Sequence, residues 1–386
     1  MNRELRPSAK RRLAAGIEVR SRVVPIDGEV LIELSIGSPP VPLKYVLDVG
    51  SDMMWTQCSP TSGSSAIYSH DTSSSFSPVP CSDNICQSKD AAFLSCNGGG
   101  SYCRYNRGYG DGSSSQGLMA KEKFTFGNGA SFKNVYFGCG QLFNKDGSTK
   151  PPADQASGIV GLGRGPLSLV SQLNLETFWY CTTGRESASG SALGVGSPAG
   201  VTAAAAITTT PLLDTLSAWY LVLLKGITVG KTALFAGQES EFELNLDGSR
   251  GMVIDSGTSF TRLIPTVYTA LRSELIAQLL VVGLQVAPAA AGLDLCFLLP
   301  GGGNTNVAFP QLTFHFDGGD LVIPTENYMQ VVTVENSNLA CLAMLSTEGT
   351  GLSTAIFGNS QQKNMNVTFD LVANNLSFKP TQCDQS

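Results

Sequence analysis

Two short segments of the chain each place an aspartate after an apolar run and before a glycine and a hydroxyl residue. The first is Tyr45–Ser51 (YVLDVGS) and the second is Met252–Thr258 (MVIDSGT), so Asp48 and Asp255 hold equivalent places. Two carboxylates held close together cannot both ionise, and they therefore share one proton. The ionised member can take a proton from water while the protonated member donates one, which is the chemistry that direct hydrolysis of a peptide bond requires.

A second element follows each aspartate at a similar distance. Ile159–Gly161 and Ile356–Gly358 are both apolar-apolar-glycine, and the glycine follows the aspartate by 113 positions (48 to 161) and by 103 positions (255 to 358). One Asp-x-Gly segment alone is weak, because aspartate and glycine are common in ordinary turns. The duplication favours a paired role and predicts two β lobes related by pseudo-symmetry.

The rest of the chain predicts a mainly β protein that supports these loops. Abundant glycine and short apolar runs indicate strands and turns, with a strand pair over 219–230 and a hairpin over 102–123 that turns at Asp111-Gly112. Apolar residues at four-residue steps predict a helix over 265–284 that begins at a proline.

The expected domain division follows from composition. A stretch rich in Gly, Ser and Ala over 184–206 marks a boundary, so we expect an N-terminal lobe over 23–200 and a C-terminal lobe over 201–386. The basic segment 1–22 has no apolar core of a secretory signal. We expect the true start to lie upstream and this segment to be a propeptide remnant.

Composition excludes several classes of function. The net charge of −6 and the lack of a Lys/Arg stripe beyond the opening exclude nucleic acid as an expected partner. The longest apolar stretch, 275–284, is too short to span a membrane. With only His70 and His315 and no CxxC pair, we expect no zinc site, no serine-type hydrolysis and no cofactor. Ten scattered cysteines and sequons at Asn366 and Asn375 favour a disulfide-bonded glycoprotein of the secretory pathway.

Several motifs, in order, resemble the nepenthesin-type branch of the pepsin-like aspartic proteases over nearly the whole chain. The motifs are SIGSPP (35–40), DVGSDMMWTQC (48–58), YGDGS (109–113), GIVGLGRGPLS (158–168), IDSGT (254–258) and GNSQQ (358–362). The resemblance implies an all-β dominated, bilobal fold with a central cleft and a β-hairpin flap, and it suggests that Cys296 pairs with Cys341. It also implies protein or peptide substrates, sensitivity to pepstatin-type inhibitors, a monomer, a zymogen, and an extracellular or vacuolar location.

The resemblance also assigns roles to residues. It implies that Asp48 and Asp255 are the catalytic pair, and that Tyr109 is the flap tyrosine, hydrogen-bonded by the indole of Trp55. The remaining positions that it carries over are the catalytic-loop residues Gly50, Ser51, Ser256, Gly257 and Thr258 and the flap residue Gly110. A packed-core tryptophan and a half-buried strand tyrosine are the structural alternatives for Trp55 and Tyr109.

The sequence departs from the family pattern at two places, and these departures leave more than one function open. Val49 stands where the family has a threonine whose hydroxyl joins a reciprocal grip with Ser256, and the segment 59–66 lacks two expected cysteines. If those two pair with each other elsewhere in the family, the ten present here can still pair fully. The first hypothesis is an aspartic endopeptidase active at acidic pH. The second is a weak or inactive relative that binds proteins or inhibits them, and a lectin-like β protein is a distant third.

Overall fold

We describe a computed structural model of the chain. The structure describes residues 19–26, 28–58, 68–88, 92–96, 100–144, 156–183, 191–196, 207–214, 218–235, 242, 251–300, 307–335 and 337–383. Three features of the sequence analysis fall outside these residues: the basic opening as far as residue 18, the cysteine-poor segment 59–66, and most of the predicted boundary. The domain limits therefore stay a prediction.

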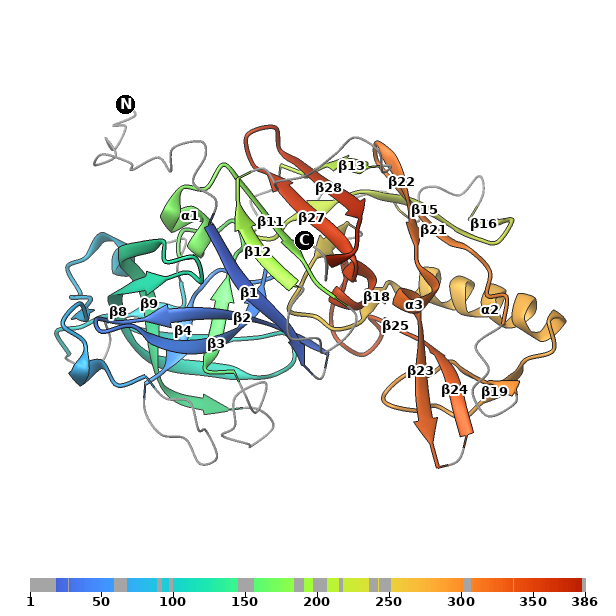
Figure 1. Ribbon diagram of the computed structural model, residues 1–386, viewed down its shortest axis with the longest axis horizontal. Helices are drawn as coiled ribbons and strands as arrows, with labels where there is room; N and C mark the ends of the chain where they lie inside the picture. The colour runs from blue at the N-terminus through green and yellow to red at the C-terminus, as the bar shows by residue number, and fades with distance from the viewer. Residues whose placement is uncertain are drawn as a thin grey trace.

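The described residues of the first half of the chain form twelve strands and one short α-helix, and Figure 1 shows their arrangement. The strands are β1 (Val19–Ile26), β2 (Glu29–Ile36), β3 (Val41–Asp48), β4 (Trp55–Gln57), β5 (Ser77–Pro78), β6 (Leu94–Ser95), β7 (Arg104–Gly108), β8 (Ser114–Thr125), β9 (Ser131–Asn144), β10 (Gly158–Gly161), β11 (Thr177–Cys181) and β12 (Ser191–Val195). The helices are α1 (Leu169–Leu173) and the 3-10 turns η1 (His70–Thr72) and η2 (Asn84–Gln87).

In the second half, the part of the chain that the structure describes adds sixteen strands and two α-helices. The strands are β13 (Thr208–Pro211), β14 (Leu221–Val222), β15 (Leu224–Val229), β16 (Thr232–Leu234), β17 (Met252–Ile254), β18 (Thr261–Leu263), β19 (Gln285–Ala287), β20 (Cys296–Leu298), β21 (Leu312–Phe316), β22 (Gly319–Ile323), β23 (Met329–Val334), β24 (Ser337–Leu342), β25 (Met344–Ser346), β26 (Ala355–Phe357), β27 (Met365–Asp370) and β28 (Asn375–Pro380). The helices are α2 (Pro265–Val281), α3 (Thr325–Tyr328) and the 3-10 turn η6 (Asn359–Gln362).

The strands form two lobes that lie side by side, and one sheet joins them (Figure 1). That sheet runs β13-β28-β27-β11-β12-β1-β2-β3-β10-β4-β9-β8-β7-β6, so β27, near the end of the chain, pairs with β11 of the first half. Strand β12 lies inside the boundary predicted over 184–206, which is therefore not a linker throughout. A central β strand forms there because its alternate side chains pack into the core.

The predicted duplication is present as two matching strand arrangements. In the first lobe β3 pairs in parallel with β10, which pairs antiparallel with β4, and β4 pairs in parallel with β9. In the second lobe β17, β26, β18 and β25 repeat these pairings in the same order and the same directions. Each aspartate stands where the first strand of its set ends, beside the apolar-apolar-glycine strand.

The other predicted elements are also found. Helix α2 begins with Pro265 and buries Val267, Leu271, Leu275 and Leu279, as the four-residue spacing predicts, although it ends at Val281 instead of 284. It stops there because the chain turns at Gly283, whose positive φ of 88° suits glycine. Two strands, β14 and β15, form within the strand pair predicted over 219–230, but they do not pair with each other: β14 pairs with β17, and β15 pairs with β16 and β21. None of the described helices is long and apolar enough to cross a membrane.

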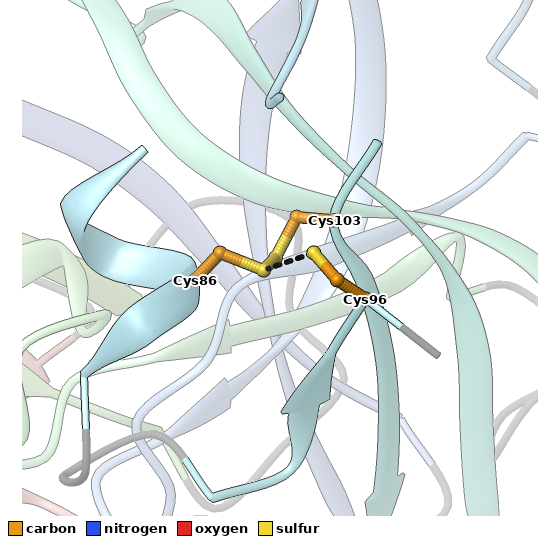
Figure 2. Close-up of side chains that lie close together, drawn as sticks. All are labelled: Cys86, Cys96 and Cys103. Atoms are coloured by element: carbon orange, nitrogen blue, oxygen red, sulfur yellow. Dashed lines mark hydrogen bonds between the residues drawn. A yellow bond between two sulfur atoms is a disulfide. The ribbon is translucent and has the colours of Figure 1, made fainter. Parts of the chain in front are cut away.

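All ten cysteines form disulfides, so the absence of the two family cysteines from segment 59–66 leaves no cysteine without a partner. The disulfides are Cys58–Cys139, Cys81–Cys96, Cys86–Cys103, Cys181–Cys383 and Cys296–Cys341, and the last is the one suggested by the family resemblance. Two of them lie against each other beside β7: the sulfurs of Cys86 and Cys96 are 3.3 Å apart (Figure 2). Because all of these sulfurs are oxidised, this cluster has no thiolate to offer a metal ion.

Candidate active site

The two aspartates meet where the lobes join, and each is held by its own loop. The backbone N–H of Gly50 donates to Asp48 Oδ1 at 2.9 Å, and the N–H of Gly257 donates to Asp255 Oδ1 at 2.8 Å. The outer oxygens accept from hydroxyls, Asp48 from Ser51 and Asp255 from Thr258. These paired bonds fix both carboxyl planes before any substrate arrives.

Each carboxyl also packs on the glycine of the opposite loop. A Cβ added to Gly50 would lie 2.5 Å from Asp255 Oδ1, and one added to Gly257 would lie 2.6 Å from Asp48 Oδ1. Any side chain at either position would push the facing carboxyl away. The glycines of the two Asp-x-Gly segments therefore have two roles: they allow the local turn, and they leave room for the two carboxyl groups to come close together.

The environment of the pair favours a shared proton. Asp48 is only 8% exposed, whereas Asp255 is half-buried. Burial is the main cause that raises the pKa of Asp48 well above its ordinary value, and the charge of Asp255 beside it raises that pKa further. The hydrogen bonds from Ser51 and Gly50 act in the opposite direction and do not cancel the rise.

The loops grip each other on one side. Ser256 Oγ accepts the backbone N–H of Val49 at 3.1 Å and donates to the carbonyl of Leu47 at 2.7 Å. Val49 occupies the equivalent place in the first loop, fully buried, and has no hydroxyl with which to return these bonds. Valine in place of threonine at position 49 therefore removes side-chain hydrogen bonds and keeps the packing of the loop.

The predicted hairpin carries Tyr109 toward the pair. Strands β7 and β8 join through a turn in which the N–H of Tyr109 donates to the carbonyl of Ser113 at 2.8 Å, and Gly112 takes a positive φ of 82°. The indole N–H of Trp55 donates to the hydroxyl of Tyr109 at 2.7 Å, as the resemblance implies. Burial, and after it the nearby Asp48, raises the pKa of Tyr109 well above its ordinary value, so this hydroxyl keeps its proton.

The structure also brings in residues that the sequence analysis did not assign. Asn359 donates to the carbonyl of Ser256 at 3.1 Å, and Gln362 donates to the carbonyl of Asp255 at 3.3 Å, so η6 supports the second loop from behind. Asp52 is buried under the first loop and accepts the N–H of Gly165 at 2.7 Å. The only sequence signal for these residues is their place inside the DVGSDMMWTQC, GIVGLGRGPLS and GNSQQ motifs.

Both halves of the chain match family models, and the chain as a whole is similar to known proteins. Residues 31–197 match the family model described as "Xylanase inhibitor N-terminal" and residues 219–380 match "Xylanase inhibitor C-terminal". Over 376 residues the chain is 42% identical to aspartic proteinase nepenthesin-1 of Nepenthes gracilis, covering 95% of this chain and 81% of the relative. Aspartic proteinase nepenthesin-2 of the same organism is 39% identical, covering 93% and 79%.

Solved structures show the same fold at lower identity. The crystal structure of edgp superposes with a TM-score of 0.75 at 20% identity, covering 98% of this chain and 97% of that one. Basic 7S globulin from soybean gives 0.74 at 20% identity, covering 95% and 97%. At this identity the likeness concerns the two-lobed β fold alone.

Proposed function

This chain belongs to the nepenthesin-type pepsin-like aspartic proteases, and from that membership we infer that it is an aspartic endopeptidase that cleaves peptide bonds inside proteins. The observation that supports Asp48 and Asp255 as its catalytic residues is the mutual packing of each carboxyl on the glycine of the other loop. That packing brings two acids, each with its own backbone and hydroxyl donors, to one point.

The proposed reaction uses the proton that the pair shares. The ionised carboxyl takes a proton from a water molecule as its oxygen attacks the peptide carbonyl carbon, and the other carboxyl donates a proton to the carbonyl oxygen. In the resulting tetrahedral intermediate, the carboxyl that took the water proton donates it to the leaving nitrogen, and the other carboxyl takes a proton from one of the two hydroxyls. The C–N bond breaks as the carbonyl re-forms, and the pair again holds one proton. Gly50, Ser51, Ser256, Gly257 and Thr258 hold the two acids in place, while Tyr109, Gly110 and Trp55 form the flap side that closes over the peptide.

An acidic working range follows from this scheme. Catalysis needs one proton on the pair, and it is lost when rising pH removes that proton. Because the pKa of Asp48 is raised, the pair keeps its single proton at pH values above those at which an isolated aspartate ionises. We therefore propose activity that is greatest in acid and declines toward neutral pH, with inhibition by pepstatin-type compounds.

We also propose where the enzyme is located and how it matures. Five disulfides and no free cysteine suit an extracellular or vacuolar monomer that matures in the secretory pathway. Removal of a basic N-terminal propeptide would complete its activation. Glycosylation at Asn366 or Asn375 is compatible with that route, although both lie within paired strands, β27 and β28.

The test is hydrolysis of an unfolded protein from about pH 3 to 7, with and without pepstatin, after incubation of the chain in acid. Asp255→Asn serves as the inactive control and Asp48→Asn as its partner. Acid-dependent, pepstatin-sensitive cleavage that either substitution abolishes is the expected result. A folded and processed chain that cleaves nothing would overturn the proposal.

One observation favours a second candidate, a protein-binding module with weak or no catalysis. Ser256 hydrogen-bonds the first loop, but Val49 makes no side-chain hydrogen bond to the second loop, so the two aspartates are held less firmly than a hydroxyl at position 49 would allow. This candidate predicts little or no turnover from the wild-type chain, and higher turnover from Val49→Thr if the missing hydroxyl is the cause.

A further inference from the structure

Arg107 stands on the flap hairpin, two residues before Tyr109. It lies in β7 opposite Ser115 of β8, and the alternation along this strand turns Tyr105 and Arg107 to one face while their neighbours are exposed. That face is the inner one, because the Tyr105 ring packs beside Met53 in the buried cluster under the hairpin. Arg107 is thus directed toward the lobe that carries Asp48 and not toward open solvent.

The guanidinium of Arg107 has no anionic or hydrogen-bonding partner among the described residues. Its Nε is buried without a hydrogen bond, and the guanidinium carbon lies 5.1 Å from the centre of the Phe93 ring. A buried donor without an acceptor costs free energy, more so when it carries charge. Stacking on Phe93 holds one face of the planar group and leaves its donor edge free.

The nearby acids of the chain do not supply the missing partner. Burial raises the pKa of Asp52, and the hydrogen bond from Gly165 and the charge of Arg107 only partly oppose that rise. Its Oδ1 accepts the N–H of Gly165, and among the described residues it forms no ion pair with Arg107. The same charge acts on Tyr109, the flap tyrosine, whose own neighbour is Asp48. Tyr109 follows Arg107 by two positions along the hairpin, so the alternation of side chains places Arg107 on the same side as the Tyr109 hydroxyl that Trp55 binds.

We propose that Arg107 is a specificity-determining residue that binds the carboxylate of an acidic side chain, aspartate or glutamate, close to the scissile bond of the substrate. A guanidinium with a free donor edge matches a carboxylate with two parallel hydrogen bonds, and lysine or a neutral amide does not reproduce that match. The inference rests on the proposed function, because a substrate peptide must lie between the flap and the aspartate pair for Arg107 to meet it.

The experiment uses one cleaved peptide and its variants at pH about 5, where a free glutamate is mostly ionised. Glutamate, glutamine and lysine are placed in turn at each of the three positions on either side of the cleaved bond, and kcat/KM is measured. The expected result is a preference for glutamate over glutamine of about tenfold at one position. Arg107→Gln should remove that preference and Arg107→Glu should reverse it toward lysine, with cleavage of the all-neutral peptide retained.

Arg104→Gln is the matched control, since Arg104 lies on the same strand but is exposed and donates to Gln141 at 2.8 Å. It should keep the glutamate preference. Equal cleavage of the glutamate and glutamine peptides at all six positions by the wild-type enzyme overturns the inference, whether or not the Arg107 variants fold, and leaves the proposed function standing. Absence of cleavage of every peptide contradicts the proposed function itself.

Discussion

Ser256 binds the backbone N–H of Val49 across a sequence separation of 207 residues, with its Oγ 3.1 Å from the nitrogen. The same hydroxyl donates to the carbonyl of Leu47, so a single buried side chain joins the second aspartate loop to the first. The equivalent bonds from the first loop are missing because Val49 has no hydroxyl. The two aspartate loops are thus coupled by a side-chain hydroxyl from one loop only, and substitutions in either loop can test that coupling.

Removing the hydroxyl at Ser256 should weaken both fold and catalysis. Ser256→Ala leaves a buried N–H and a buried carbonyl without their partner, at a cost of about 1–3 kcal/mol in free energy of unfolding. We expect kcat to fall with it, because the two aspartates lose their alignment. Denaturant unfolding and peptide hydrolysis measure the two effects. Ser256→Thr, which keeps the hydroxyl, should retain most of both, and an Ala variant as stable as wild type would refute the coupling.

Restoring a hydroxyl at Val49 should have the opposite effect. Val49→Thr is nearly isosteric and places an oxygen near the backbone of Ser256 and Ile254, which correspond to the groups that Ser256 now contacts. We expect about 1 kcal/mol of added stability and a higher kcat. Val229→Thr, at another fully buried valine, is the control and should destabilise the protein because its hydroxyl has no such partner. An equal loss of stability in Val49→Thr and Val229→Thr would show that the hydroxyl at position 49 has no hydrogen-bond partner.

The buried carboxyl of Asp48 should make stability depend on pH. Its pKa in the folded state is raised from the ordinary value near 3.8, mainly by burial. Below that ordinary value the group is protonated in both states. As pH rises, the unfolded chain ionises first, so folded-state stability declines until the raised pKa is passed. Asp48→Asn, which cannot ionise, should match wild type near pH 3 and gain on it toward pH 7 while remaining inactive. Thermal unfolding across that range measures the difference, and a constant offset would contradict it.

A methyl group at Gly257 should displace the facing acid. The Cβ of Gly257→Ala would lie 2.6 Å from Asp48 Oδ1, closer than two such atoms can approach, so the carboxyl must move. A shift of the order of 1 Å in a reacting group can cost about 100-fold in rate, and we expect a loss of that size in kcat/KM. Gly100→Ala, whose added methyl would meet nothing within 4 Å, is the control for alanine substitution. Wild-type activity in Gly257→Ala would mean that the two loops are not packed as described.

The duplicated unit is the part of this protein that the sequence alone determined. An apolar strand, an Asp-x-Gly turn and a downstream apolar-apolar-glycine strand are local patterns, and their repetition was enough to predict two lobes and to single out Asp48 and Asp255. Helix α2 and the flap hairpin were predictable for the same reason, since the four-residue spacing and the Asp-Gly turn are written in neighbouring residues. The end of α2 was missed by three residues, because apolar residues continue past the point where Gly283 turns the chain.

Only the tertiary structure decided how distant residues meet. Contacts between segments far apart in the chain decide which cysteines pair, that β27 joins β11, and that Asn359 and Gln362 support the second loop. They also decide that the Nε of Arg107 has no hydrogen-bond partner among the described residues. Periodicity shows which face of a strand is buried, but it does not identify the group that the buried face will meet. The pKa of Asp48 has the same origin, since it depends on burial and on a second carboxyl that lies far away in sequence and adjacent in space.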